Sequence, residues 1–144
     1  MLYFDTSYLV RLYLSDQGAE EVRSLAATSD LASSFHGGIE SIAAFHRAYR
    51  EKRINYNTYQ AILDQFDDDV KGGAYTWLTV GPELIPKLEK TYRSASANLF
   101  LRAADALHLA CARENGFTEV YTHDRRMLEA APLFGLKPKN IIKS

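Results

Sequence analysis

The segment from Ala103 to Glu114 constrains the fold of this chain most strongly, because its pattern predicts a helix that is apolar on nearly every side. Its small or apolar residues are Ala103, Ala104, Ala106, Leu107, Leu109, Ala110, Cys111 and Ala112. A helix on the surface of a domain keeps a polar face toward water, whereas one that is apolar all round is enclosed by other elements. We therefore expect this helix to lie inside the domain.

Short apolar runs that favour strands alternate with helical patterns along the rest of the chain. The strands are expected at residues 2–4, 31–34, 75–80 and 120–122. The helices are expected at residues 8–14, 19–27 and 38–52, from a cap at Asn57 to Gly72, from Pro82 onward, and at 103–114 and 124–131. Such alternation predicts an α/β fold, a three-layer α/β/α domain whose central, mainly parallel sheet is covered on both faces.

The length of 144 residues suits one domain over residues 1–144, and no repeat, low-complexity tract or flexible linker divides it. The formal net charge of −1 argues against a protein that holds nucleic acid by bulk electrostatics, since such domains are strongly basic. A nucleic-acid enzyme is compatible with this charge if local positive patches exist. A single cysteine, Cys111, and the lack of a long uncharged apolar run predict a cytoplasmic protein with no membrane span.

Two aspartates directly follow predicted strands. Asp5 comes after the strand at residues 2–4, and Asp124 comes just beyond the strand at residues 120–122. In open α/β sheets, ligand sites form at the carboxyl ends of parallel strands. Taken alone, Asp5 has a simpler interpretation, which is that it caps the helix that follows it.

Two further acidic residues occupy positions where a charge is costly. Glu40 lies in the first turn of a predicted helix between Ile39 and Ile42. Asp105 lies inside the most apolar helix of the chain, where an unpaired charge costs several kcal/mol. Asp105 is also explained by pairing with Arg102 one turn earlier, or by capping a helix that starts late. Taken together, however, four converging carboxylates repel one another and make sense chiefly around a divalent cation.

The types of donor atom indicate which metal such a site holds. Oxygen-only donors suit Mg²⁺ or Mn²⁺, which keep several waters and are shared with substrate phosphate. Zinc is disfavoured, because the histidines at positions 36, 46, 108 and 123 and the single cysteine form no HExxH or CxxC motif. The expected chemistry is the activation of water for in-line attack on a phosphodiester. Thr6, Ser7 and Thr122 flank the acidic residues and are candidates to orient them.

Four stretches of the chain resemble the motifs of PIN-domain ribonucleases. The start, Leu2–Ser7 (LYFDTS), looks like the opening of that family. Ala104–Ala110 (ADALHLA) and Tyr121–Arg126 (YTHDRR) resemble its two later acidic motifs in the right order, and Gly38–Ile42 (GIESI) matches the remaining one. The resemblance covers nearly the whole chain, and the ADALHLA stretch is its most specific part.

This resemblance implies that Asp5, Glu40, Asp105 and Asp124 hold Mg²⁺ or Mn²⁺, with Thr122 as an auxiliary polar residue. The size and element order are similar to those of the toxins of VapBC-type toxin–antitoxin pairs. By that likeness, the chain is expected to be a metal-dependent endoribonuclease that acts on RNA, is silenced by a small cognate antitoxin and forms a homodimer. The segment before Glu40, Phe35-His36-Gly37-Gly38, departs from the family pattern, and its two glycines weaken the predicted start of the helix.

Other polar features have structural as well as functional interpretations. A basic cluster fits either contact with an RNA backbone or a solvated helix face, and consists of Arg47, Arg50, Lys52 and Arg53. The run Asp67–Asp69 cannot converge on one ion, since consecutive helical residues point about 100° apart. His108 is expected to be a packed, hydrogen-bonded residue rather than a general base.

Two other functions compete with a nuclease. A PIN-like fold that has lost activity would serve as a binding or scaffold module, but the presence of all four acidic residues argues against such a loss. A phosphatase with Asp5 as nucleophile needs a second aspartate two residues later, where this chain has Ser7.

Overall fold

The computed structural model describes residues 1–143 and pairs all of their strands in parallel. One ladder has the order β1 (Leu2–Tyr3), β2 (Leu31–Ser34), β3 (Tyr75–Leu78), and a second pairs β4 (Glu119–Tyr121) with β5 (Lys137–Lys139). A parallel bridge between Phe4 and Tyr121 joins the two ladders, so that β1 and β4 are neighbours. The strand order across the sheet is therefore β3-β2-β1-β4-β5.

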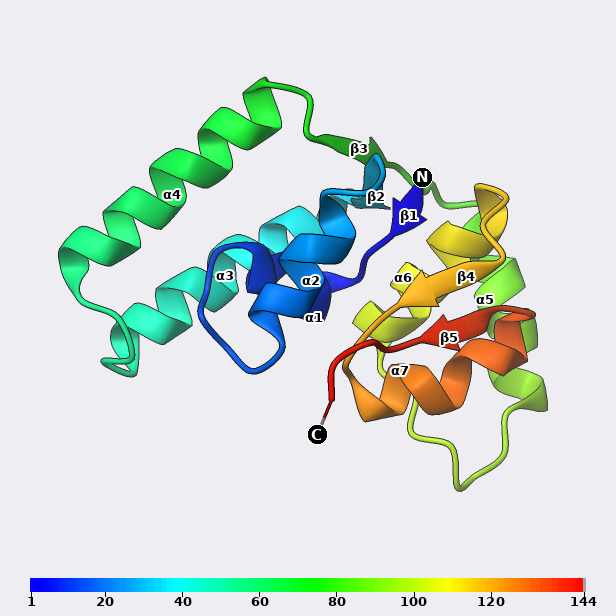
Figure 1. Cartoon of the computed structure of the whole chain (residues 1–144). Helices are drawn as coiled ribbons and strands as arrows, with labels where there is room; N and C mark the ends of the chain where they lie inside the picture. The colour runs from blue at the N-terminus through cyan, green and yellow to red at the C-terminus, as the bar shows by residue number, and fades with distance from the viewer. Residues whose placement is uncertain (144) are drawn as a thin grey trace.

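Helices connect the strands and cover both faces of the sheet (Figure 1). The α-helices are α1 (Thr6–Leu9), α2 (Ala19–Ala26), α3 (Phe35–Arg50), α4 (Tyr56–Lys71), α5 (Leu84–Ser94), α6 (Ala103–Glu114) and α7 (Arg125–Ala130). Two short 3-10 helices follow α1 and α7, at Val10–Leu12 and Ala131–Phe134. None of the helices formed by residues 1–143 is long and apolar enough to cross a membrane.

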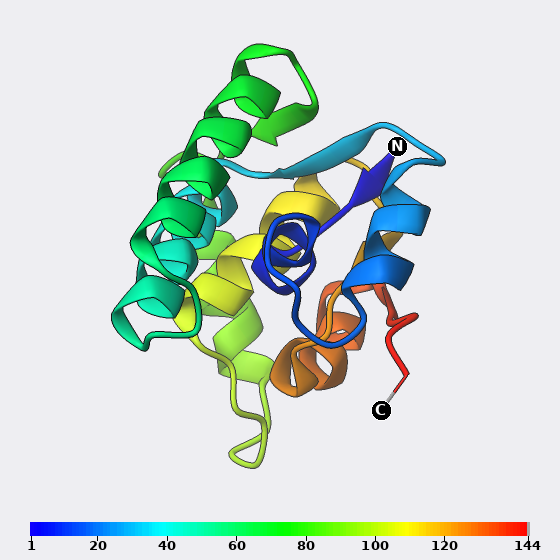
Figure 2. The same cartoon turned by 60° about the vertical axis from the view of Figure 1, so that its left-hand side comes forward.

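Two hydrophobic cores lie on opposite sides of the sheet, because successive strand residues point to opposite faces. Phe4 belongs to the core covered by α1 to α4, which includes Phe45 and Phe66. Tyr3 belongs to the other core, in which Leu109 of α6 and Met127 of α7 are fully or almost fully buried. Figure 2 shows α6 in the middle of the molecule, between the α3–α4 pair and α7. This arrangement confirms the predicted three-layer α/β/α fold with a parallel sheet.

The buried helix predicted at residues 103–114 has these bounds in the structure. Its side chains at Ala106, Leu109, Cys111 and Ala112 are at most 1% exposed, which confirms that the helix lies inside the domain. Burial on this scale stabilises the fold by roughly 25 cal/mol for each Å² of apolar surface removed from water.

Several element boundaries differ from the sequence prediction. The expected cap at Asn57 is wrong: α4 begins two residues earlier, where the Asn55 side chain accepts a hydrogen bond from the amide of Thr58 (2.8 Å). Both asparagines have the right chemistry for a cap, and the sequence alone does not choose between them. The helix expected at residues 8–14 begins at Thr6 and continues as a 3-10 turn.

The sheet also contains a strand that the sequence did not indicate. β5 is only three residues long, and it consists of two lysines around Pro138. It has no apolar run to mark it, and proline is tolerated because β5 is at the edge of the sheet. The helix expected to begin at Pro82 instead begins at Leu84, after a turn in which the Leu84 amide donates to the carbonyl of Gly81.

Candidate metal centre and active site

The candidate site lies at the carboxyl ends of β1 and β4, in the centre of the sheet. Strands β2 and β3 lie on one side of β1, and β4 and β5 lie on the other, so the strand order reverses between β1 and β4. In α/β sheets, ligands bind at such switch points. The amide of Asp5 donates to the carbonyl of Tyr121 (3.1 Å), so the sheet itself places Asp5 beside the segment that leaves β4.

Asp5 is almost completely buried, with 2% of its surface exposed. Its carboxylate accepts hydrogen bonds from the hydroxyls of Ser7 (2.6 Å) and Thr122 (2.5 Å), and it caps α1 through the amide of Tyr8 (3.2 Å). Burial raises the pKa of Asp5 above its ordinary value, against the effect of a charge on His108 and of these hydrogen bonds. The capping role and a place in the acidic site therefore belong to the same side chain.

Asp124 and Thr122 are linked to Asp5 through the turn that follows β4. Asp124 caps α7, because its Oδ1 accepts from the amides of Arg126 (2.8 Å) and Met127 (3.2 Å). The hydroxyl of Thr122 donates to Asp5 and accepts from the amide of Asp124 (3.0 Å). Thr122 is thus the buried connection between two of the predicted metal ligands.

Asp105 pairs with Arg102, as one of its two structural interpretations predicted. Arg102 Nε lies 2.8 Å from Asp105 Oδ2, and its Nη2 lies 3.3 Å from Oδ1. The same Nη2 atom lies 2.9 Å from Asp124 Oδ2. One guanidinium therefore contacts two of the carboxylates and lies between them, and its single charge balances only part of theirs. The sequence did not indicate the contact with Asp124.

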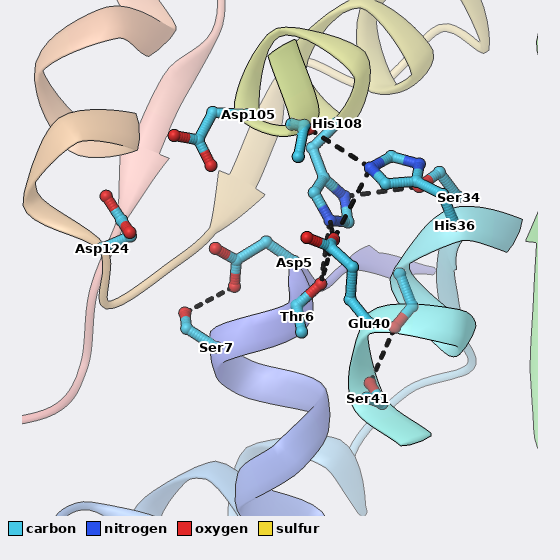
Figure 3. Close-up of polar contacts among 12 residues, drawn as sticks. Asp5, Thr6, Ser7, Ser34, His36, Glu40, Ser41, Asp105, His108 and Asp124 are labelled. Carbon is cyan, nitrogen blue, oxygen red and sulfur yellow. Dashed lines mark hydrogen bonds and ion pairs between the residues drawn. The ribbon is translucent and has the colours of Figure 1, made fainter. Parts of the chain in front are cut away.

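Glu40 reaches the site from α3. Its Oε1 accepts from the hydroxyl of Thr6 (2.7 Å) and lies 3.1 Å from Nε2 of His108, as Figure 3 shows. Burial alone would raise the pKa of Glu40, but the hydrogen bonds from His108 and Thr6 outweigh it and hold the pKa below its ordinary value. Burial lowers the pKa of His36, and a charge on His108 lowers it further.

The two glycines before Glu40 lie inside α3, which begins at Phe35, and they allow close packing. A Cβ atom on Gly37 would lie 2.8 Å from Cε1 of His108 and 2.8 Å from Oγ of Ser33. Glycine is therefore required for α3 to approach α6. The sequence predicted that these glycines weaken the start of the helix; instead they let α3 pack closely enough to place Glu40 at the site.

All four predicted ligands line one hollow of about 240 Å³, together with Thr6, Ser7, Arg102, His108 and Met127. The carboxylate oxygens of the three aspartates are too far apart to contact one ion all at once, since they do not all lie within 4.8 Å of one another. Within residues 1–143, the group that meets this distance is His36, Glu40 and His108. An oxygen-lined site of this width suits an ion that keeps several of its own waters.

His36 was missed by sequence reasoning. The spacing of four between His36 and Glu40 places both on one face of a helix, but only if the helix begins before His36. His108 is packed and hydrogen-bonded, as expected, through its contacts with Tyr3 (2.8 Å) and Glu40.

A comparison with family models matches residues 2–132 to the PIN domain. No individual curated protein matches the chain significantly. PIN domains are generally nucleases that act on nucleic acid, and they typically use divalent metals. The match spans most of the chain and includes the strands, helices and turn that carry all four acidic residues, so the chain belongs to the PIN domain family.

Proposed function

We propose that this protein is a Mg²⁺- or Mn²⁺-dependent endoribonuclease. The observation that carries the proposal is the convergence of Asp5, Glu40, Asp105 and Asp124 on one hollow, from four separate elements. Arg102 is the cation that contacts two of them, so the group keeps a net negative charge that a divalent ion would balance.

The donor atoms fit such an ion. Asp5, Asp105 and Asp124 offer only oxygen atoms, and these are the ligands that Mg²⁺ and Mn²⁺ prefer. When bound, the ion supplies Lewis-acid activation of water and neutralises charge on a phosphodiester. Thr122 and Ser7 hold the Asp5 carboxylate in a fixed orientation through its two oxygens, and Glu40 completes the acidic set from the opposite side.

The acidic hollow adjoins two other hollows, and together the three would form a path for a nucleic-acid strand. A hollow of about 280 Å³ shares Thr6 and Glu40 with it and includes Arg47. Another hollow, of about 470 Å³, shares Asp124 with it and includes Phe100, Arg125 and Arg126. Arginines at both ends would contact phosphates while the acidic residues face the bond to be cut. Arg47 pairs with Glu51 and Arg125 pairs with Glu129, so these arginines lie among acidic side chains. In a protein with a net charge of −1, RNA binding should therefore be weak and sensitive to salt.

RNA cleavage tests the proposal. We expect the purified protein to cut single-stranded RNA in Mg²⁺ or Mn²⁺ and to lose this activity in EDTA. Asp5→Asn and Asp105→Asn should each abolish cleavage while the protein remains folded. Asp67→Asn is the matched control, because Asp67 is an exposed acid on α4 that pairs with Lys71. Full cleavage by either site variant, or by the wild type in EDTA, would contradict the proposed mechanism.

We also propose that the protein is the toxin of a type II toxin–antitoxin pair, as a single domain over residues 1–144 in the cytoplasm. Apolar side chains on α3 support a partner-binding face, since Phe35, Ile39 and Ile42 are 46%, 60% and 44% exposed. Exposed apolar patches of this kind are typical of interfaces. This face would receive a small antitoxin or the second subunit of a homodimer.

The toxin role and the dimer are tested separately. Expression of the active protein alone should stop growth, and co-expression with the cognate antitoxin should restore it. Normal growth with verified active enzyme would count against a toxin. Light scattering should give the mass of a dimer, and a monomer would remove that part of the proposal.

A further inference from the structure

A second group of metal-binding side chains lies beside the acidic hollow, and the proposed nuclease does not use all of it. His36 and Glu40 are one turn apart on α3, and His108 comes from α6. Oε1 of Glu40 lies 3.1 Å from Nε2 of His108 and 3.7 Å from Nε2 of His36. Ligand atoms bound tetrahedrally to one zinc ion are about 3.4 Å apart, given bond lengths of about 2.1 Å.

Both imidazole rings are held through the nitrogen that faces away from Glu40. Nδ1 of His108 lies 2.8 Å from the hydroxyl of Tyr3 and 3.5 Å from that of Ser34. Nδ1 of His36 lies 2.5 Å from the same Ser34 hydroxyl. Histidines that bind metals are oriented in this way, with one nitrogen hydrogen-bonded and the other free for the ion. Because hydroxyl groups both donate and accept, they accommodate the tautomer in which Nε2 is the ligand.

The histidine rings are closely packed. Their centroids are 4.2 Å apart, and Gly37 permits this packing because any Cβ there would meet His108. His108 is 2% exposed, whereas the Glu40 side chain is 38% exposed and borders the acidic hollow. An ion would therefore enter past Glu40. It would replace the contact of 3.2 Å between Nε2 of His36 and the carbonyl of Ala104, and the contact of 3.0 Å between Nε2 of His108 and the hydroxyl of Thr6.

We propose that His36, Glu40 and His108 form a binding site for a divalent transition-metal ion, with Zn²⁺ as the best fit. Two imidazole nitrogens and one carboxylate are a common zinc ligand set, and they leave a fourth position for water. Mg²⁺ does not favour nitrogen ligands, so this site and the aspartates select different ions. The sequence disfavoured zinc because its histidines and single cysteine form no HExxH or CxxC motif. Glu40 and His108 are 68 positions apart, so no local motif contains both.

Occupation of this site would hold the Glu40 carboxylate against the histidines. This consequence rests on the proposed nuclease function, in which Glu40 serves the acidic set. Zn²⁺ should therefore inhibit Mg²⁺-dependent cleavage by the wild type and inhibit His36→Gln much less. The binding of the ion itself does not depend on any RNA activity, so it is tested independently.

Cobalt is the probe for binding, because four-coordinate Co²⁺ absorbs visible light far more strongly than six-coordinate Co²⁺. Titration of the metal-free protein with Co²⁺ should produce a strong band that excess Mg²⁺ does not remove and Zn²⁺ does. His36→Gln should weaken Co²⁺ binding at this site by at least about tenfold. His46→Gln should leave the band unchanged, because His46 is an exposed histidine on the same helix. Asp105→Asn should also leave it unchanged.

The same titration identifies the outcome that overturns the proposal. A band that survives in His36→Gln and disappears in Asp105→Asn would place the ion among the aspartates. Absence of a band in the wild type would exclude the site altogether. Glu40→Gln, which keeps the shape of the side chain, provides a second variant, and it should also lose the band. Circular dichroism of each metal-free variant separates a lost ligand from a lost fold.

Discussion

Arg102 occupies the place of a cation in the acidic hollow, so its removal should change stability and metal affinity in opposite directions. Its guanidinium contacts both oxygens of Asp105 and one oxygen of Asp124. A divalent ion at the aspartates would have to replace these contacts. We therefore expect Arg102→Gln to destabilise the metal-free protein and to bind Mg²⁺ more tightly than the wild type.

The magnitude follows from the burial of the partners. Exposed ion pairs contribute about 0.2–1 kcal/mol, whereas breaking a buried pair costs about 3–5 kcal/mol. The side chain of Arg102 is 47% exposed and that of Asp105 is 9% exposed, so an intermediate value of about 2 kcal/mol is appropriate. In a domain of this size, this loss lowers the Tm by roughly 7 °C. If the ion must displace Arg102, the same energy makes Mg²⁺ binding about 30-fold tighter in the variant.

Two measurements test this reasoning. Thermal melts in EDTA should show the lower Tm of Arg102→Gln, and the deficit should disappear as Mg²⁺ saturates both proteins, because the ion then balances the aspartates in each. Calorimetric titration should give the tighter affinity. Arg125→Gln is the control, since it removes an equal charge from a side chain that is 91% exposed. Equal Mg²⁺ affinities, with a deficit that is the same with and without Mg²⁺, would refute the competition.

Three further predictions concern other buried groups. Since the folded-state pKa of Asp5 is raised, its charge destabilises the metal-free fold above that pKa, and this penalty is relieved as the pH falls through it. Asp5→Asn should therefore be more stable than the wild type at pH 7, and this gain should shrink toward pH 4. Denaturant unfolding at the two pH values measures the difference. Cys111 is fully buried and burial raises its pKa to about 11, so a thiol reagent at pH 8 should label it only after unfolding; rapid labelling of the native protein would contradict this. Gly37→Ala should destabilise the protein by about 1–3 kcal/mol in spite of the better helix propensity of alanine, because its Cβ would clash with His108. Gly38→Ala should destabilise it less, since its Cβ would lie 3.1 Å from the Trp77 ring. Chemical denaturation of both variants gives the two free energies of unfolding.

Helix α6 and the ends of β1 and β4 could be predicted because their signals are local. The all-round apolar pattern of residues 103–114 determines a buried helix wherever it is placed. Asp5 and Asp124 follow short apolar runs, and strand ends are where parallel sheets form ligand sites. Strand β5 gave no such signal, because it is a short edge strand with proline at its centre.

The sequence by itself determined the α/β class, the buried position of Asp105 and the set of acidic residues that line the hollow. Only the tertiary structure decided the partners of these side chains: that Arg102 contacts Asp124 as well as Asp105, and that Glu40 faces His108. The physical reason is that helix and strand periodicity depends on neighbouring residues, whereas a contact between α3 and α6 depends on how closely the two helices pack. That distance depends on Gly37, which has no Cβ atom to collide with His108, and no local sequence pattern encodes the distance.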